Sequence, residues 1–242
     1  MATPHIEVLV FEGCPHAAQA LELARSVAER LAPEVAVSRV DVTSDEAASR
    51  LRFYGSPTIL VDGEDVEGRD GPSTGLSCRV YDADGQSEGV PPEWMVEAAL
   101  LRTLEPKHIL FLCVANSARS QMAEGLARSM ARAGMTVSSA GSEPSRVRPE
   151  AITVLAELGI DISAHRSKAV ADLDTSTVDT VITLCAEEVC PLYLGRARRL
   201  HWGLPDPAAV TGVGEARLEA FRRTRDRLRR RLELLLRREE SE

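Results

Sequence analysis

Short apolar runs alternate with amphipathic stretches along the whole chain, and this alternation predicts strands and helices in turn. Over the first part of the chain the predicted order is β-α-β-α-β-β-α. The expected strands lie at 6–11, 35–42, 58–61 and near 77–81, and the expected helices begin at about Pro15, after Thr43 or Ser44, and at about Pro92. A proline at the first turn suits a helix start, because that position needs no intrahelical N–H donor.

From Lys107 onwards the pattern predicts the order β-α-β-α-β-α-β-α, which is typical of a doubly wound parallel sheet. The expected strands are 109–112, 136–140, 178–184 and 199–202, the second helix runs from Pro149 to Leu158 before Gly159, and a last helix carries apolar residues at three- and four-residue intervals from Leu218 to Leu235. Acidic residues interrupt the arginine-rich back of that last helix. We therefore expect it to pack on the sheet rather than to act as a coiled coil or a nucleic-acid arm.

Composition supports two domains of ordinary size. The chain has 242 residues, of which 44% are hydrophobic and 27% are charged, as in globular proteins with sizeable cores. Residues 1–105 carry 8 basic and 19 acidic side chains, whereas residues 106–242 carry 21 and 18. This shift predicts a boundary near Glu105–Lys107 and favours an anionic substrate for the second domain, although two solvated surfaces of different ancestry give the same shift. The expected fold class is α/β in both domains.

The sequence disfavours several partners and locations. No stretch approaches the ~18 apolar residues that a membrane span needs, and no signal peptide opens the chain, so we expect a cytoplasmic protein without a membrane partner. A net charge of −8 disfavours binding to nucleic acid. Five cysteines, an odd number, indicate reactive thiols rather than a disulfide framework.

One cysteine stands in a context that predicts nucleophilic chemistry. Cys113 follows the apolar run 109–112 and leads through a five-residue loop to Arg119, where a helix begins. The backbone N–H groups of such a loop and the positive end of the helix favour both an anion and a thiolate. The guanidinium adds two parallel charge-assisted hydrogen bonds to a tetrahedral oxyanion. Cys190 and Arg196 have the same spacing but lack the strand and the helix, so the context carries this prediction of a site for phosphate or arsenate.

Two further features converge on this site. Cys185 and Cys190 come just after the predicted strand 178–184, and the strand ends of a doubly wound sheet gather at one edge. A zinc site is not expected there, because no second cysteine pair or suitably spaced histidine completes a tetrahedral set. Asp206 lies between two prolines after the last strand, where a carboxyl group can protonate an oxygen that leaves the substrate. An Asp-Pro turn without chemistry is the alternative, and no metal or cofactor is expected.

The first domain has its own candidate thiol. Cys14 lies between the first strand and the first helix, where the helix N-terminus favours a thiolate, and Ser56-Pro57-Thr58 precedes a later strand. This order resembles the thioredoxin fold, in which a cysteine at that place faces a cis-proline loop. The family's second active cysteine is missing, because Ala17 stands in its place, and Cys78 is the only other thiol in the domain. A degenerate thioredoxin fold that serves as a docking module is the alternative, and His16 is expected to be a helix-start residue rather than a metal ligand.

From Lys107 to the C-terminus the chain resembles the thioredoxin-coupled arsenate reductases, which are built on the low-molecular-weight tyrosine phosphatase fold. The matching segments, in order, are Cys113–Gly125, Ser139–Ser142, Gly159–Ser163, His165–Lys168, the Cys185/Cys190 segment, and His201-Trp202 before Asp206-Pro207. The resemblance implies an oxyanion-binding loop formed by Val114, Ala115, Asn116, Ser117, Ala118, Arg119 and Ser120. It also implies arsenate as the substrate and thioredoxin or another thiol as the reductant.

The resemblance further implies a relay of thiols. Cys113 attacks the bound arsenate while Asp206 protonates the departing oxygen. Cys185 then attacks the arsenic adduct of Cys113, which releases arsenite and leaves a disulfide. Cys190 moves that bond to a Cys185–Cys190 disulfide, which an external thiol can reduce. The four residues between these two cysteines are fewer than family members commonly have.

A second departure concerns a potassium site that some family members have near the loop. Asn116, Glu124 and Ser139 match its ligands, but Lys168 stands where an aspartate is expected. The ammonium of Lys168 can take the electrostatic role of the cation, so we predict that activity does not depend on potassium.

Two other functions are open on the sequence alone. One is a phosphatase of the same fold acting on phosphotyrosine or a small phosphoester, and the other is a non-enzymatic protein that binds arsenite or a metal. Gln121, where such phosphatases usually carry proline, and the paired cysteines favour reduction. Arsenite binding alone leaves Arg119 and Asp206 without a role. The first domain is expected to supply or recruit the reductant, or to capture arsenite on Cys14.

Overall fold

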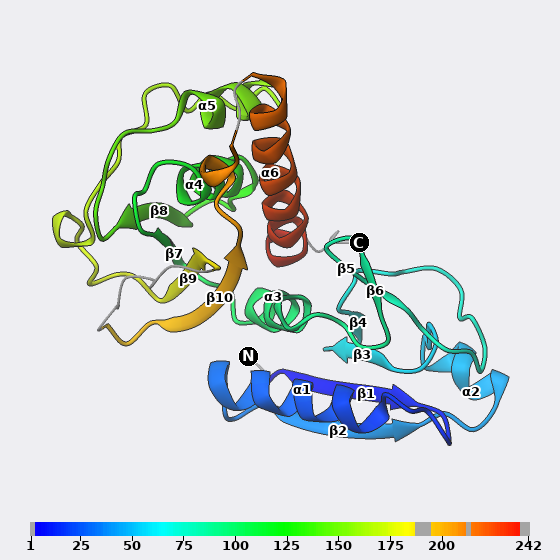
Figure 1. The fold of residues 1–242 in the computed structure, drawn as a ribbon. Helices are drawn as coiled ribbons and strands as arrows, with labels where there is room; N and C mark the ends of the chain where they lie inside the picture. Colours follow the sequence, from blue (N-terminus) through cyan, green and yellow to red (C-terminus); the bar gives the residue numbers. More distant parts are fainter. Residues whose placement is uncertain (1–2, 187–194, 212–213, 238–242) are drawn as a thin grey trace. The chain divides into compact units, whose positions relative to one another are not determined.

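The computed structural model describes residues 3–186, 195–211 and 214–237, and the chain divides into two compact units, Met1–Glu105 and Pro106–Glu242. Each unit is an α/β structure with its own four-stranded sheet (Figure 1). Within the described ranges, no helix has the length and apolar character that a membrane span requires.

The first unit contains a sheet in the order β2-β1-β3-β4. Its elements are β1 (His5–Val10), α1 (Ala17–Leu31), β2 (Ala36–Asp41), α2 (Asp45–Arg50), β3 (Thr58–Val61), β4 (Glu64–Asp65) and α3 (Glu93–Thr103). β1 pairs with β2 in parallel and with β3 in antiparallel fashion, so the sheet is mixed. The α2 helix begins where expected, because the Ser44 hydroxyl caps it by accepting a hydrogen bond from the Ala47 amide at 3.2 Å.

The strand expected near 77–81 is not part of this sheet, and that prediction is wrong. The structure has two short strands that pair with each other, β5 (Tyr81–Ala83) and β6 (Gln86–Glu88). Val80 is 56% exposed, whereas the Arg79 side chain is buried in an ion pair with Asp65. This is the reverse of the alternation that a strand over an apolar core needs, and Cys78 takes part in an isolated β-bridge instead.

The second unit contains a fully parallel sheet in the order β10-β9-β7-β8, as expected for a doubly wound fold. Its elements are β7 (His108–Cys113), α4 (Arg119–Met130), β8 (Thr136–Gly141), α5 (Pro149–Ala156), β9 (Thr180–Cys185), β10 (Arg198–Leu204) and α6 (Glu215–Leu236), with 3-10 turns at Val170–Asp172 and Pro207–Ala209. The helix expected between the last two strands falls in a stretch that includes 187–194, which lie outside the described residues.

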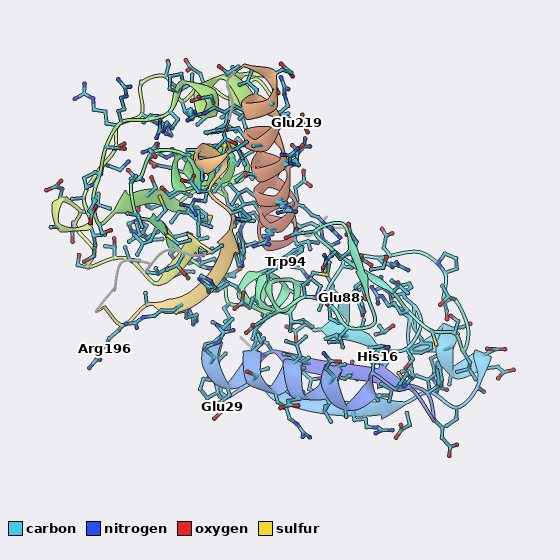
Figure 2. The ribbon with its side chains drawn as sticks, in the orientation of Figure 1. His16, Glu29, Glu88, Trp94, Arg196 and Glu219 are labelled. Atoms are coloured by element: carbon cyan, nitrogen blue, oxygen red, sulfur yellow. The ribbon has the colours of Figure 1, made fainter. Side chains whose placement is uncertain are left out.

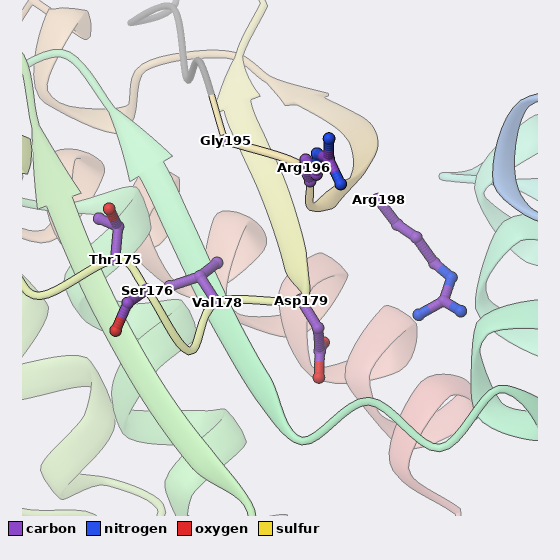
Figure 3. Close-up of a pocket in the computed structure, with 7 residues that line it drawn as sticks. All are labelled: Thr175, Ser176, Val178, Asp179, Gly195, Arg196 and Arg198. Atoms are coloured by element: carbon purple, nitrogen blue, oxygen red, sulfur yellow. The ribbon is translucent and has the colours of Figure 1, made fainter.

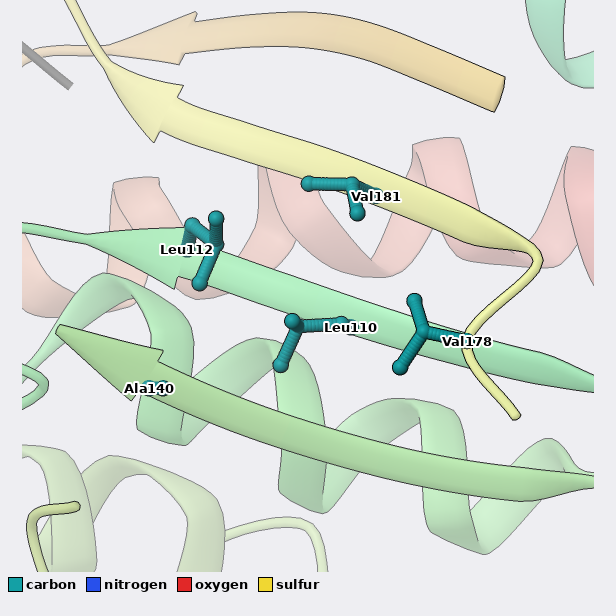
Figure 4. Close-up of a cluster of buried hydrophobic side chains, with 5 residues drawn as sticks. All are labelled: Leu110, Leu112, Ala140, Val178 and Val181. Carbon is teal, nitrogen blue, oxygen red and sulfur yellow. The ribbon is translucent and has the colours of Figure 1, made fainter. Parts of the chain in front are cut away.

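Apolar side chains of three neighbouring strands form the core on one face of this sheet. Leu110 and Leu112 of β7, Ala140 of β8 and Val181 of β9 are buried together with Val178, which precedes β9 (Figure 4). All six residues of β7 are buried. A central parallel strand has no solvent-facing side, which explains why β7 appears in the sequence as an almost continuous apolar run.

The last helix packs against α4 and α5, the other helices of its unit. Its apolar positions, among them Phe221, Leu228 and Leu232, are buried, which confirms that the leucine pattern marks a packing face. Glu219 lies on the exposed side of the same helix (Figure 2). Arg223 and Arg229 are exposed as well, whereas Arg225 and Arg231 are buried.

The carboxyl ends of the parallel strands bring the candidate site together. In the register of the sheet Leu112 lies opposite Thr183, and Cys185 lies opposite Leu204. Cys113, one residue after Leu112, and Cys185 therefore end neighbouring strands at the same edge, which is where open α/β sheets bind their ligands.

Candidate active site at the Cys113 loop

The loop between β7 and α4 turns its carbonyl groups outward. Four consecutive carbonyl oxygens accept hydrogen bonds from groups outside the loop: Val114 from the Glu143 amide at 3.0 Å, Ala115 from the Ser145 amide at 3.0 Å, Asn116 from the Ser167 hydroxyl at 2.7 Å and Ser117 from the Arg148 amide at 2.9 Å. A trans peptide points its N–H opposite to its C=O, so each bonded carbonyl turns the next N–H toward the inside of the loop. The loop therefore presents a row of amides, an arrangement that binds anions.

The thiol of Cys113 lies among these donors. The Asn116 amide donates to Cys113 Sγ at 3.2 Å, and Ser120 Oγ lies 2.9 Å from the same sulfur. Ser120 Oγ also accepts from the Asn116 side-chain amide at 2.8 Å, which leaves its own hydrogen free to donate to the sulfur. The positive end of α4, which begins at Arg119, also faces the loop. These groups are placed to support a nucleophilic sulfur and a bound oxyanion together.

Asn116 is the residue that fixes the loop. Its φ of 44° lies in the left-handed region, which asparagine tolerates better than most residues. Its buried side chain has four partners: the amide group donates to Ser120 and Ser139 at 2.8 Å each, and the oxygen accepts from Gln121 Nε2 at 2.9 Å and from the Lys168 amide at 2.8 Å. A substitution here removes several connected hydrogen bonds at once.

Gly141, at the end of β8, lets the loop approach the sheet. A Cβ atom at this position would lie 2.3 Å from the Val114 carbonyl oxygen and 2.9 Å from the Asn116 amide nitrogen. Both atoms belong to the loop backbone, so a side chain cannot be accommodated unless the loop moves. The sequence marked Gly141 only as part of a matching segment, because this contact joins segments that are far apart in the chain.

Arg119, Asp206 and Cys185 meet at the end of β10. Arg119 is buried and donates to the Leu204 carbonyl at 2.9 Å, and another of its nitrogens lies 4.0 Å from Asp206 Oδ1. The Asp206 side chain is one-third exposed, and its carboxylate accepts a backbone hydrogen bond at 3.1 Å. Cys185 is 1% exposed and pairs with Leu204 across the sheet. Cys190, the third thiol of the expected relay, lies outside the described residues.

A buried carboxylate lies behind the loop. Glu124 is fully buried, and it is surrounded by the Ser139 hydroxyl, the Arg128 guanidinium and Lys168 Nζ, the last at 3.2 Å. The ammonium of Lys168 therefore supplies a positive charge beside Glu124, as the sequence suggested. Independence from potassium stays a prediction.

Sequence patterns did not reveal how Gln121 and His165 support the loop. Gln121 is buried and donates through Nε2 to Asn116, while its Oε1 lies 2.9 Å from His165 Nδ1. An Arg128 nitrogen lies 3.2 Å from His165 Nε2, so that nitrogen must accept and the neutral ring carries its proton on Nδ1. Burial lowers the pKa of His165, in agreement with a neutral ring. The sequence marked Gln121 only as a residue that replaces a proline and His165 only as part of a matching segment.

In the first unit, Cys14 follows β1, Pro57 directly precedes β3 and Cys78 precedes β5. Cys14 is half-buried and Cys78 is exposed, and both are free thiols. The peptide bond between Ser56 and Pro57 is cis. His16 is the N-cap residue of α1, so it lies at a helix start as expected (Figure 2). Its side chain makes no capping hydrogen bond to a described residue.

A pocket of about 700 Å³ lies at the other edge of the parallel sheet. Its lining residues precede or begin β9 and β10 and are Thr175, Ser176, Val178, Asp179, Gly195, Arg196 and Arg198 (Figure 3). Asp179 accepts hydrogen bonds there from the amides of Lys107 and His108 at 2.7 and 3.2 Å, which is a structural role. Arg196, which shares its spacing from a cysteine with Arg119, therefore lies away from the Cys113 loop. No cluster of three His, Cys, Asp or Glu side chains within the described ranges could hold a metal.

A family of known proteins matches the part of the chain that contains this loop. Residues 108–242 match the family described as low molecular weight phosphotyrosine protein phosphatase. Arsenate reductases of Halalkalibacterium halodurans and Bacillus subtilis are each 40% identical over 131 residues, which cover 53% of this chain and 94% of each relative. A solved arsenate reductase in the oxidized state is 36% identical and matches 54% of this chain and 96% of its own, with a TM-score of 0.47. A thioredoxin-dependent arsenate reductase of Corynebacterium glutamicum is 30% identical and matches 55% of this chain and 66% of its own, with a TM-score of 0.39.

Proposed function

The chain belongs to the low molecular weight phosphotyrosine protein phosphatase family, where its relatives are arsenate reductases, and from this premise we propose that residues 106–242 reduce arsenate to arsenite. One observation carries the proposal. The Cys113 thiol lies in an amide-lined loop, and a second buried thiol, Cys185, ends the neighbouring strand. An oxyanion site beside two thiols suits the reduction of the bound oxyanion better than its hydrolysis.

The first step forms a sulfur–arsenic bond. The Cys113 thiolate attacks arsenic, and one arsenate oxygen leaves as water after Asp206 has supplied a proton. Arg119 and the loop amides hold the remaining oxygens and their developing charge. The product is an arsenic(V) adduct on the cysteine sulfur, without a change of oxidation state.

The second step is the reduction. The Cys185 thiolate attacks the Cys113 sulfur, the sulfur–arsenic bond breaks, and its electron pair reduces arsenic(V) to arsenic(III), which leaves as arsenite. The Cys190 thiolate then attacks Cys185, so that Cys113 is freed and a Cys185–Cys190 disulfide remains for an external dithiol such as thioredoxin. Because Cys113 is only 2% exposed, a relay to other sulfurs gives an external reductant a partner that it can reach.

Hydrolysis of a phosphoester is the alternative activity of this site. Cys113, Arg119 and Asp206 suffice for it, so a low phosphatase activity is expected beside reduction. The two activities separate in the variant Cys190→Ser. A reductase then stops after about one turnover while hydrolysis of p-nitrophenyl phosphate continues, because only the relay needs the third thiol. Arsenate turnover that continues at the wild-type rate in this variant contradicts the relay.

We also propose that residues 1–105 form a thioredoxin-like domain that supplies or recruits the reductant. Its support is the β1-α1-β2 unit followed by antiparallel β3 and β4 and the helix α3, with Cys14 just before α1. Covalent linkage raises the local thiol concentration to the mM range where the linker allows contact. Such exchange needs a reducing compartment, so the proposed location is the cytoplasm.

Disulfide mapping by mass spectrometry tests this supply of electrons in cis. The reduced full chain is incubated with arsenate and quenched with acid. A mixed disulfide between Cys14 and either Cys185 or Cys190 is expected. Exclusive Cys185–Cys190 pairing, recycled equally well in a Cys14→Ser variant, contradicts supply in cis.

A further inference from the structure

The first unit holds two free thiols that are far apart in sequence, Cys14 and Cys78. Cys14 is half-buried in the turn after β1, where its amide donates to the Phe11 carbonyl and its carbonyl accepts from the Ala17 amide, at 3.3 Å each. Cys78 is exposed on the segment before β5. Neither has a second cysteine nearby in the chain, so any partner must come from the fold.

Ser56 connects the two cysteine-bearing segments. Its amide and carbonyl bond to the residues on either side of Cys78, at 2.8 and 3.1 Å, so that Cys78 lies directly beside Ser56 in a parallel bridge. The Ser56 hydroxyl accepts from the Phe11 amide at 3.3 Å, three residues before Cys14. Ser56 itself is 1% exposed, so the connection is sheltered from water.

A hollow of about 480 Å³ is bounded by both segments. Phe11 and Glu12 line it from the Cys14 turn, and Leu76 lines it from the Cys78 segment. The remaining lining residues lie at the end of β2 and are Arg39, Asp41, Val42 and Thr43. The two segments therefore border one hollow, and each cysteine lies two residues beyond a lining residue, Glu12 or Leu76.

Cys78 is held in place although it is exposed. The adjacent Arg79 side chain is 1% exposed and forms a bidentate ion pair with Asp65, at 2.6 and 2.7 Å. Its guanidinium also lies 4.2 Å from the centre of the Tyr81 ring, whose hydroxyl donates to the Pro57 carbonyl at 2.8 Å. Separation of this buried ion pair would leave an unpaired charge in the core. The pair therefore holds the Arg79 side chain against Asp65. The Cys78 segment is thereby anchored to the loop that contains Pro57.

We propose that Cys14 and Cys78 form a redox pair, in which a cysteine remote in sequence takes the place of the second thiol of a Cys-x-x-Cys motif. The Cys14 thiolate attacks one sulfur of a substrate disulfide and releases the other sulfur as a thiolate. The Cys78 thiolate then attacks the Cys14 sulfur, forms the Cys14–Cys78 disulfide and releases the second thiolate. Two electrons pass from the pair to the substrate, and the two protons of the pair go to the released thiolates.

Peptide mapping of the full chain tests the pair directly. The reduced protein is equilibrated at low concentration in mixtures of reduced and oxidised glutathione, quenched with acid, alkylated and digested with trypsin. Cys14 falls in the peptide 1–25 and Cys78 in the peptide 70–79. We expect the disulfide-linked pair of these peptides to become the main form of both cysteines as the mixture becomes oxidising. Separate glutathione adducts on the two cysteines, or Cys14 linked mainly to another cysteine, overturn the proposal.

Two variants sharpen the test. In Cys78→Ser the second step is lost, so Cys14 should stop as a mixed disulfide with one glutathione. In the same background Ala36→Cys places an exposed thiol at the start of β2, beside His5 and at the opposite end of β1 from Cys14, so no link to Cys14 is expected. A link formed as readily from position 36 as from position 78 means that chance encounters suffice, which overturns the pair. Arsenate takes no part in this experiment, so its outcome is independent of arsenate reduction.

Discussion

Cys113 and Cys14 both follow a strand and precede a helix, yet the two turns hold their sulfur atoms differently. At Cys113 the loop carbonyls are bonded by other segments, the amides face inward, and the residue is 2% exposed. At Cys14 the hydrogen bonds stay within the turn, because the Cys14 amide donates to the Phe11 carbonyl and the Cys14 carbonyl accepts from the Ala17 amide. Cys14 is also partly open to solvent.

This difference shows that one order of elements can serve two kinds of reaction. Several N–H groups must converge on an oxyanion, and a loop can turn them inward only where other segments bond its carbonyls. Thiol–disulfide exchange needs no such cradle, but it needs access to the sulfur and a second thiol within reach. The proposed roles follow this division, with arsenate at Cys113 and disulfides at Cys14.

The largest effect on arsenate reduction is expected when the sulfur atoms of Cys113 and Cys14 are replaced one at a time. Cys113→Ser should lower arsenite formation by about 10⁴-fold or more, because a hydroxyl is a weak nucleophile and cannot pass electrons to arsenic. Cys14→Ser should leave the first turnover intact. Arsenite release in single-turnover experiments measures both. An equal loss in the two variants breaks the comparison, since it places Cys14 in the oxyanion chemistry.

The next effect tests whether the structural context of Arg119, and not only its spacing from a cysteine, makes it an oxyanion ligand. Arg119→Lys replaces a planar fork by a point charge and should lower kcat/KM for arsenate by about 10²- to 10³-fold, as loss of an oxyanion donor does. Arg196→Lys is the matched control, because Arg196 has the same spacing from a cysteine but lines a pocket at the other edge of the sheet. Comparable losses in both variants contradict the assignment of the oxyanion to the Cys113 loop.

A smaller effect tests whether the rigidity of the loop comes from its contacts with other segments. Gly141→Ala introduces a Cβ that clashes with the loop backbone, so we expect a destabilisation of about 1–3 kcal/mol and a loss of activity of at least about tenfold. Gly71→Ala is the control, because nothing lies within 4 Å of a Cβ there. Urea unfolding and arsenate turnover provide the two measurements. A fully active Gly141→Ala protein shows that the loop does not depend on this close approach.

Local order in the sequence sufficed to predict the candidate site at the Cys113 loop. Cys113 and Arg119 were identified from the apolar strand before them and the helix after them, and the parallel sheet followed from the alternation of elements. The contact between Lys168 and Glu124 was anticipated through the resemblance to arsenate reductases. These features depend on residues that are close in the chain or on a known pattern of residues.

Contacts between distant backbone groups were beyond prediction. Nothing in the sequence of the loop reveals that the amides of Glu143, Ser145 and Arg148 bond its carbonyls, because those bonds are set by tertiary packing. The strand expected near 77–81 failed for a related reason. A pattern shows that Val80 is apolar but not that it faces solvent while its charged neighbour Arg79 is buried.

A pH dependence is expected from the support behind the loop. Burial lowers the pKa of His165, so the folded protein holds the ring neutral while the unfolded chain protonates it near its ordinary pKa of about 6.5. The resulting stabilisation is complete above that pH and is lost as the pH falls below it toward the folded pKa. The charged groups that face the ring are Arg128 and Lys168, which add to the lowering, and Glu124 and Asp161, which oppose it.

Activity should follow the same direction. Protonation puts a hydrogen on Nε2, which removes the acceptor for Arg128 and loosens Gln121 and the loop, so kcat should fall a few-fold, on the order of 1 kcal/mol in barrier, at mildly acid pH. His165→Gln should flatten this fall. Burial lowers the pKa of His108 as well, but that residue begins β7 and bonds Thr177 at the other edge of the sheet. His108→Gln should therefore change the pH dependence of unfolding and leave that of kcat unchanged, and the opposite result contradicts the role of His165.

The smallest effect concerns the choice between potassium and sodium salts. It tests whether the Cys113 loop is ordered by contacts within the protein rather than by a bound ion. Lys168 Nζ lies 3.2 Å from the buried Glu124 and supplies a fixed cation, so activity in potassium and in sodium at equal ionic strength should agree within about twofold, less than 0.5 kcal/mol. Lys168→Asp removes that charge and adds a carboxylate, which should lower activity and make it respond to potassium. Lys168→Met removes the charge alone and should lose activity with a weaker response. Strong activation of the wild type by potassium means that the Lys168 ammonium does not replace the ion. The Cys113 loop then needs bound potassium to become ordered, whereas we attribute that order to the contacts of the loop with the rest of the protein.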